Sequence, residues 1–433
     1  MVNKKREYWI LGGFIMLLTL VSACGILSSD EDNTLLKVKT ISAVEVALEV
    51  QGNPGDQIII ARGGEERYAF RLNQPDTLIY ETGLEPATSY TWSITNQSTI
   101  NGRWQNHKQQ ATTLDTTSSN FTWQTFSFGE HSSSVLYGVS IIDENNIWAV
   151  GEIYMNDSTG QADSDAYNVA HWNGTEWDFK KLQFYTFCNQ PNTGSYPATS
   201  VIAFSENDLR ISSASQVTRY NGTEQIVTEC IPTSVNKLWG TDSSNVYAVG
   251  NNSTISHYNG QSWQKIETGT ELDFYDIHGN EQQGVVAIAA RQSVSSDKAI
   301  VRIKEDLTTK PLSTTPIPFS ISGIWFDASG VTYVVGSRIS VKSDIDYTGP
   351  WRVLDKSVID HPYLFAMDAN GLNDLVAVDG YGEIIHFNGG VWTLYEQGIE
   401  GNLYDIAMKE NAVMAVGYDG RKAFITIGKR VTN

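Results

Sequence analysis

The chain has 433 residues, of which 41% are hydrophobic and 11% aromatic, and 49 acidic residues against 30 basic ones give it a net charge of −19. So many large apolar side chains exclude a disordered chain, because disordered segments lack the surface that must be buried to offset the entropy of folding. The charge argues against a nucleic-acid partner, since binding a phosphate backbone needs a cationic surface, and no run of Lys or Arg longer than a pair follows residue 6.

Residues 1-23 have the pattern of an export signal. Residues 4-6 are basic, and the apolar stretch over residues 10-20 is too short to cross a bilayer comfortably as a helix. The sequence Val-Ser-Ala before Cys24 resembles the lipobox of bacterial lipoproteins. The resemblance implies that Cys24 becomes the lipid-modified first residue and that acyl chains hold the protein at a membrane. An ordinary signal peptide or an N-terminal anchor is the alternative.

The residues after the cysteine bear on location. Gly25 stands where lipoproteins retained in the inner membrane of Gram-negative bacteria have Asp, so the resemblance implies the outer membrane or the cell surface. Residues 24-36 contain the acidic run 30-32 and predict a solvated acidic tether. We expect a monomer whose contact with the membrane is its N-terminal lipid.

Residues 37-115 alternate apolar and polar side chains with the period of two that is typical of β-strands. Within them, the sequence Leu-Glu-Pro-Ala-Thr-Ser-Tyr over residues 84-90 resembles the corner between strands E and F of fibronectin type III domains. The resemblance implies a fibronectin type III-like β-sandwich, in which Leu84 fills the core and the hydroxyl of Tyr90 bonds to backbone. Residues 116-120 lack apolar periodicity and predict a linker.

From residue 121 to residue 433 one pattern recurs roughly every 40 residues. Each unit has an apolar strand, a polar turn, a strand of the type Ala-Val-Gly, a third strand, an Asn-Gly turn and a fourth strand that begins near a Trp. The Ala-Val-Gly strands and their weaker copies start at Ile147, Leu209, Val246, Val286, Thr332, Leu375 and Val413. Four strands per repeat are typical of a propeller blade, so the chain is predicted to be all-β with a seven-bladed β-propeller over 121-433.

The seventh unit ends near residue 427, before any fourth strand. Residues 121-126, which include Trp123, precede the first unit and have strand alternation. We therefore expect this N-terminal strand to complete the last blade and close the ring, which removes exposed strand edges. The Ala-Val-Gly and Asn-Gly-x-x-Trp repeats resemble those of bacterial extracellular propellers, a scaffold that hosts many unrelated roles.

Two cysteines remain besides Cys24. Cys188 and Cys230 belong to a chain whose signal directs it to an oxidising compartment, where disulfides persist. They lack the His or Cys neighbours that a zinc site requires. We predict a disulfide between them, with buried or free thiols as the alternative.

The positions of the histidines argue against a metal site. His171, His257 and His386 occupy the same repeat position, so they lie on different blades and cannot converge on one ion. We expect them to form structural hydrogen bonds near the hairpins. No metal and no cofactor is predicted, except that two loops rich in oxygen ligands leave structural calcium open without matching the spacing of an EF-hand. These loops contain Asn156, Asp157, Asp163 and Asp165, and Asp368, Asn370, Asn373 and Asp374.

No catalytic residue is predicted. The repeat boxes of sialidase propellers are not evident, and neither a Gly-x-Ser-x-Gly elbow nor a His-Glu-x-x-His motif occurs. The alternative is a polysaccharide-acting enzyme, a glycosidase or a lyase, with carboxylates gathered at the axial mouth of the propeller.

Long loops on one rim of the propeller are the strongest functional signal. Loops are expected over residues 152-168, 185-197, 291-298 and 337-347, whereas the opposite rim has short turns. The predicted binding face contains Tyr154, Tyr185, Phe187 and Tyr196. The sequence thus predicts a lipid-anchored envelope protein that binds a protein or a glycan through this face. Alternatively, these aromatic side chains only pack the loops against the ring.

Overall fold

A computed structural model describes residues 36-97, 104-291, 294-346, 349-354 and 363-431 of the chain. The predicted signal over 1-23, Cys24 and the tether up to residue 35 lie outside the described residues. Within the described part, the regular elements are β-strands, and no helix there is long and apolar enough to cross a membrane. The prediction of an all-β protein is confirmed.

The first strands form a sandwich of two antiparallel sheets, with strand orders β1-β2-β5 and β4-β3-β6-β7. Side chains that alternate along these strands meet between the sheets, where Leu48, Ile60 and Trp92 are completely buried. The seven strands are β1 (Leu36–Ile41), β2 (Glu45–Gln51), β3 (Gln57–Arg62), β4 (Glu65–Arg71), β5 (Asp76–Thr82), β6 (Ser89–Gln97) and β7 (Trp104–Thr112).

The corner before β6 contains the contacts that the sequence led us to expect. Leu84 is buried in the core of the sandwich. The backbone N–H of Glu85 donates a hydrogen bond of 2.9 Å to the hydroxyl of Tyr90, which ties β6 to the preceding turn. Membership of the fibronectin type III family itself stays a prediction.

Seven four-stranded antiparallel sheets follow in the described residues, and they are the blades of a propeller. Blades 1 to 4 are β9 (Val135–Asp143), β10 (Asn146–Ile153), β11 (Tyr167–Trp172) and β12 (Trp177–Lys180); β15 (Ser200–Ser205), β16 (Asp208–Ser213), β17 (Gln216–Tyr220) and β18 (Gln225–Cys230); β19 (Ser234–Asp242), β20 (Asn245–Asn251), β21 (Ile255–Tyr258) and β22 (Trp263–Ile266); and β23 (Asp273–Asn280), β24 (Gly284–Arg291), β25 (Val294–Ile303) and β26 (Thr309–Leu312).

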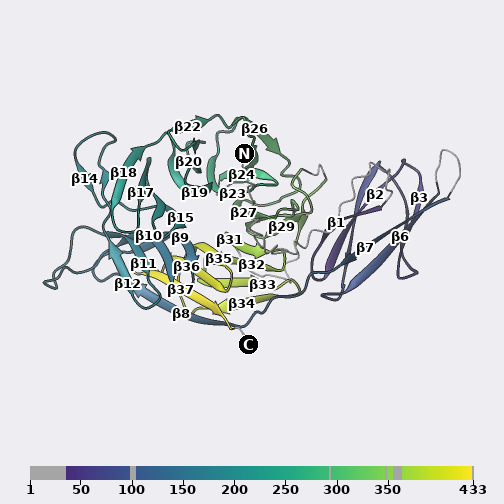
Figure 1. Cartoon of the computed structure of the whole chain (residues 1–433), viewed down its shortest axis with the longest axis horizontal. Helices are drawn as coiled ribbons and strands as arrows, with labels where there is room; N and C mark the ends of the chain where they lie inside the picture. Colours follow the sequence, from purple (N-terminus) through teal and green to yellow (C-terminus); the bar gives the residue numbers. More distant parts are fainter. Residues whose placement is uncertain (1–35, 98–103, 292–293, 347–348, 355–362, 432–433) are drawn as a thin grey trace, which may run out of the picture. The chain divides into compact units, whose positions relative to one another are not determined.

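Blades 5 to 7 have the same order of strands. They are β27 (Ile321–Phe326), β28 (Thr332–Gly336), β29 (Ile339–Lys342) and β30 (Arg352–Val353); β31 (Leu364–Gly371), β32 (Asp374–Asp379), β33 (Glu383–Phe387) and β34 (Trp392–Glu396); and β35 (Asn402–Lys409), β36 (Ala412–Tyr418), β37 (Ala423–Arg430) and β8 (Phe121–Phe128). Figure 1 shows the first strands of the blades around the centre of the ring and the fourth strands at its perimeter.

The N-terminal strand closes the ring as predicted. β8 pairs antiparallel with β37 from Phe121 opposite Arg430 to Phe128 opposite Ala423, and Trp123 lies opposite Gly428. Blade 7 therefore combines strands from both ends of the propeller sequence, and a cluster of apolar side chains from blades 1 and 7 seals the junction.

The glycine of the repeated Ala-Val-Gly pattern is required by packing within a blade. A β carbon on Gly417 would lie 1.8 Å from the carbonyl oxygen of Asn402, and one on Gly250 would lie 1.7 Å from that of Ser234. Each carbonyl belongs to the first strand of the same blade. Any larger residue would push the first two strands apart, which explains why glycine marks the repeat.

Two of the four predicted long loops are wrong. The segment 291-298 is mostly strand, because β24 extends to Arg291 and β25 begins at Val294. The segment 337-347 contains β29, so only residues 337-338 join the second and third strands of blade 5. Ser340 and Lys342 are buried polar residues of this strand, which spans only four residues and is therefore easily mistaken for part of a loop.

The propeller has two faces, which we name by their connections. The long-loop face carries the connections between second and third strands and those between blades. The turn face carries the turns between first and second strands and, in blades 1 to 6, those between third and fourth strands. On the long-loop face, residues 154-166 join β10 to β11, as predicted. The predicted loop over 185-197 contains a small hairpin of β13 (Phe184–Tyr185) and β14 (Thr193–Gly194).

Candidate functional site

The turn face is held by polar pairs that repeat from blade to blade. In each pair, a histidine of the third strand donates from Nε2 to the first residue of the second strand in the same blade. The pairs are His171 with Asn146 at 3.0 Å, His257 with Asn245 at 2.7 Å and His386 with Asp374 at 2.8 Å. The three histidines thus lie on different blades and form local hydrogen bonds near the hairpins, as predicted.

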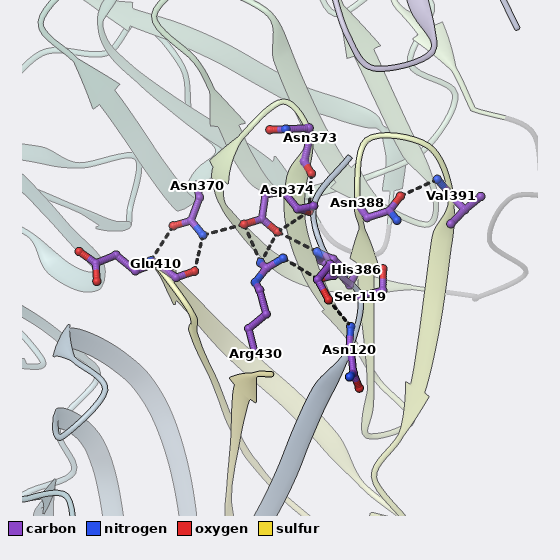
Figure 2. A network of polar contacts seen from close by, with 12 residues as sticks. Ser119, Asn120, Asn370, Asn373, Asp374, His386, Asn388, Val391, Glu410 and Arg430 are labelled. Atoms are coloured by element: carbon purple, nitrogen blue, oxygen red, sulfur yellow. Dashed lines mark hydrogen bonds and ion pairs between the residues drawn. The ribbon is translucent and has the colours of Figure 1, made fainter. Parts of the chain in front are cut away.

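Blade 6 has the most elaborate of these clusters. Figure 2 shows side chains converging on Asp374, which accepts hydrogen bonds from His386, from Asn370 at 2.8 Å and from Arg430 at 2.6 and 2.7 Å. Asp374 and Arg430 are only 7% and 8% exposed. Burial alone would raise the pKa of Asp374, but the hydrogen bonds from His386, Arg430 and Asn370 hold that pKa below its ordinary value.

The same cluster binds residues 116-120, which were predicted only as a linker. Arg430 donates to the carbonyl of Ser118, and the hydroxyl of Tyr395 donates to the carbonyl of Ser119. The hydroxyl of Thr117 donates to the carbonyl of Asn373 at 2.8 Å. Polar groups of this part of the turn face are therefore engaged by the chain itself (Figure 2).

The loops considered for calcium use many of their oxygens on protein donors. Asp157 accepts hydrogen bonds from Thr159 and Gln161, and Asp163 forms an ion pair with Lys181. Among the described residues, no three or more His, Cys, Asp or Glu side chains are arranged to hold a metal ion. Structural calcium, which the sequence left open, is thus untested by the geometry, and an unchanged melting temperature in a calcium titration would reject it.

The first strands of the blades line the axial channel. Lys237 of β19 forms an ion pair of 2.6 Å with Asp405 of β35. Because blades 3 and 7 are not neighbours in the ring, this pair spans the channel. Burial alone would lower the pKa of Lys237, but the carboxylates of Asp405, Asp276 and Asp368 raise it above its ordinary value.

These carboxylates also join neighbouring blades. Asp276, Asp368 and Asp405 each accept a backbone N–H from the first strand of the next blade. Asp276 accepts from Ile324 at 2.8 Å, Asp368 accepts from Met408 at 2.8 Å, and Asp405 accepts from Val139 at 3.1 Å. Burial raises the pKa of Asp276 to about 7 and that of Asp368 to about 6.

At the other junctions between blades, uncharged side chains form the corresponding hydrogen bonds. Ser140, Ser200, Asn236 and Ser322 bond to the backbone of the following blade. In the described part of the chain, one such bond therefore joins every neighbouring pair of blades. The axial carboxylates are parts of this ring of hydrogen bonds, which is a structural role.

Aromatic side chains gather where the channel opens on the long-loop face. We call the set Tyr137, Tyr154, Tyr363, Phe365, Tyr404 and Tyr418 the aromatic arc. Ring centroids lie 6.1 Å apart for Tyr137 and Tyr404, 5.7 Å for Tyr404 and Tyr418, 5.6 Å for Phe365 and Tyr404, and 5.2 Å for Tyr363 and Phe365. The arc thus extends over blades 1, 7 and 6.

Glu152 lies beside this arc. The hydroxyl of Tyr154 donates a hydrogen bond of 3.2 Å to its carboxylate. Burial, and then the negative charge of Glu152, raise the pKa of Tyr137, whose side chain is 37% exposed. The carboxylate of Glu152, the exposed ring of Tyr137 and the half-buried ring of Tyr154 are therefore neighbours at the axial end of blade 1.

The structure separates the four predicted binding residues into two places. Tyr154 belongs to the aromatic arc, whereas Tyr185, Phe187 and Tyr196 lie in or beside the hairpin of β13 and β14. Tyr196 bonds to Thr186 at 2.8 Å, and Phe187 is 73% exposed. Tyr196 therefore helps to hold the loop and Phe187 faces solvent, whereas binding through these residues stays a prediction.

The hairpin is attached to the outer strand of blade 2. Cys188 and Cys230 form a disulfide in the structure, with Cα atoms 5.8 Å apart. Gln216 of β17 also bonds to both backbone groups of Tyr185. The exposed ring of Phe187 is therefore presented on an anchored loop.

Most of the aromatic arc and the axial residues were not predicted from the sequence. Tyr404-Asp405 and Tyr275-Asp276 occupy the same place in the first strands of their blades. An alignment of the first strands, instead of the Ala-Val-Gly strands, would have shown this repeated Tyr-Asp pair. Tyr137 has no acidic residue after it, and its relation to Glu152 depends on strand pairing.

Comparisons with known proteins bear on the fold. The chain is similar to YCF48 bound to a D1 peptide (17% identity, TM-score 0.53, 72% of this chain and 97% of that chain) and to YCF48 from Cyanidioschyzon merolae (13%, 0.50, 71% and 98%). It is also similar to a chain in the crystal structure of a mitotic checkpoint complex (10%, 0.52, 74% and 98%). At these identities the likeness shows the propeller fold alone. No family model and no curated protein matches the chain.

Proposed function

We propose that the chain is a bacterial lipoprotein of the cell envelope that binds a protein partner through the long-loop face of its propeller. The observation that carries the proposal is the contrast between the faces. Exposed aromatic rings and a carboxylate lie together on the long-loop face, whereas polar groups of the turn face are bonded within the chain.

A structural neighbour supports a protein as the partner. YCF48, which shares the fold, is described bound to a D1 peptide. A propeller of this kind thus offers a surface on which a segment of another protein binds. For the present chain, an exposed aromatic surface would serve a peptide better than a phosphate-bearing ligand, because the net charge is −19.

Crosslinking from both faces tests the proposal. A photoreactive phenylalanine is placed at Phe187 on the long-loop face or at Val391, which is 59% exposed on the turn face. We expect a discrete crosslinked protein in intact cells from position 187 and none from position 391. Adducts from position 391 alone would contradict the assignment of the face, and adducts from neither position would contradict protein binding.

The lipid anchor at Cys24 is a separate part of the proposal. It is supported by the lipobox-like sequence before Cys24 and by the acidic tether that follows. Cys24→Ser is expected to move the protein from the membrane pellet to the soluble fraction, where we expect it to be a monomer. Retention of the variant in the pellet would contradict a lipid anchor.

We propose that the protein is not an enzyme. The axial carboxylates, which the alternative of a polysaccharide-acting enzyme requires, accept backbone N–H groups of neighbouring blades. A screen of glycans for turnover tests this directly. A product that forms with the wild type and disappears with Asp276→Asn or Asp405→Asn would favour the enzyme instead.

A further inference from the structure

The aromatic arc has the chemistry of a site for a cation. Tyrosine rings carry negative charge density on their faces and attract ammonium or guanidinium groups. Tyr137 and Tyr404 are stacked with an interplanar angle of 29°, and Tyr137 remains partly open to solvent. The carboxylate of Glu152 lies next to these rings and adds a full negative charge.

The nearby cations of the chain have partners or lie outside the arc. Lys237 is paired with Asp405 across the channel. Lys422, in the turn between β36 and β37, is close to Asp419. Burial alone would raise the pKa of Asp419, but backbone hydrogen bonds and the charge of Lys422 lower that pKa below its ordinary value. Arg421 lies in the same exposed turn. Among the described residues, no lysine or arginine of the chain lies over the ring of Tyr137.

We propose that the aromatic arc binds a lysine or arginine side chain on an extended segment of a partner protein, with the cation against Tyr137 and beside Glu152. This inference rests on the proposed function and specifies its partner chemistry. Charge complementarity favours such an occupant, because the chain has a net charge of −19 and the arc carries its own carboxylate. A glycan stacked on the same rings is the competing outcome.

Peptides of defined charge test the inference. Fluorescein-labelled hexa-arginine and hexa-glutamine peptides are titrated with the purified chain, with residues 1-23 removed and Cys24→Ser, at 0.15 M salt. We expect hexa-arginine to bind and hexa-glutamine not to bind. Chitohexaose is the competitor, and displacement of hexa-arginine by this sugar would support the glycan and overturn the inference.

Variants separate the arc from the general negative charge of the protein. Glu152→Gln and Tyr137→Leu are each expected to weaken hexa-arginine binding about fivefold, which corresponds to ~1 kcal/mol. Tyr137→Phe keeps the ring face and is expected to bind nearly as the wild type. The matched control is Glu176→Gln, an equal change of charge on the turn face of the same blade, with less than a twofold effect.

The outcomes distinguish this inference from the proposed function. Equal weakening by Glu152→Gln and Glu176→Gln would mean nonspecific attraction and overturn the cation site. Crosslinking from position 187 that persists while hexa-arginine fails to bind would reject the cation site alone. Loss of all crosslinks from the long-loop face would reject the protein-binding function itself.

Discussion

The two faces of the propeller use their polar and aromatic side chains in opposite ways. On the turn face, His386, Asp374 and Arg430 satisfy one another and hold the segment before the first propeller strand. On the long-loop face, Tyr137 and Glu152 retain exposed or half-buried polar and aromatic surface. The difference indicates that the turn face stabilises the ring, and the proposed function assigns recognition to the long-loop face.

The comparison also shows where function is to be sought in a repeat protein. Features that recur in several blades, such as the histidine pairs and the Asn-Gly turns, maintain the blade. Features without a counterpart in the other blades, such as the loop over residues 154-166 and the hairpin of β13 and β14, depart from the repeat. Because such loops leave the strands of the blades unchanged, their sequences can differ between blades without disturbing the scaffold.

The largest expected effect is on the turn face. Asp374→Ala leaves Arg430 buried without its carboxylate, and we expect the free energy of unfolding to fall by about 3 kcal/mol or more in urea denaturation. Asn245→Ala is the matched control, because it removes neutral hydrogen bonds to His257 and Thr241 but no buried ion pair, and it is expected to cost about 1 kcal/mol. Equal effects of the two variants would contradict a special role for blade 6.

Removing the disulfide should affect the long-loop face. The double variant Cys188→Ser, Cys230→Ser opens a loop with a sequence separation of 42 and is expected to lose roughly 2–4 kcal/mol of unfolding free energy. Limited proteolysis should then cut near residues 186-192 before it cuts the blades. Cleavage first on the turn face would contradict local anchoring of the hairpin.

The axial channel and the turn face should respond to pH in opposite directions. The pKa of Asp276 is raised to about 7 from an ordinary value of 3.8, so the native state binds its proton more tightly than the unfolded chain. Its contribution to the free energy of unfolding therefore falls as pH rises from about 4 to 7. The lowered pKa of Asp374 gives stability above pH 4 that is lost at lower pH.

Melting temperatures of Asp276→Asn and wild type from pH 4 to 8 measure this effect. The melting temperature of the variant is expected to increase relative to that of the wild type as pH rises, because the variant lacks the buried carboxyl group that must ionise. Lys237, Asp405 and Asp368 face the same channel and remain in both proteins, so the difference isolates Asp276. A difference that does not change with pH would contradict the raised pKa.

The smallest expected effect on stability is at the aromatic arc. Glu152→Gln and Tyr137→Phe should each change the free energy of unfolding by no more than about 0.5 kcal/mol, because neither position supports a buried ion pair in the described structure. Urea denaturation at pH 7 measures this. A loss above about 1.5 kcal/mol from either variant would assign the arc to the structure of the ring.

Much of the fold was predictable because the propeller is built from local patterns. Alternating apolar residues predict strands, Gly174 and its equivalents adopt the positive φ of tight turns, and the unit repeats along the chain. Closure of the ring by Trp123 and its neighbours followed from counting strands. The error at residues 337-347 arose because β29 spans only four residues, so its alternation of apolar and polar side chains is too short to stand out from a loop.

The candidate site was predictable only in part. Tyr154 was named because it lies in a long loop, but Tyr137 and Tyr404 lie in regular strands far apart in sequence. Their rings meet only because the last blade closes against the first. Likewise, Lys237 and Asp405 become partners because strands from blades 3 and 7 line one channel.

The sequence alone therefore determined the strands, their grouping into seven blades and the position of the closing strand, since these depend on periodicity and on turn residues near one another in the chain. The tertiary structure decided which side chains share the axial mouth and which face stays open. That decision requires the curvature of the closed ring, which brings residues separated by hundreds of positions into contact and has no signature in local sequence.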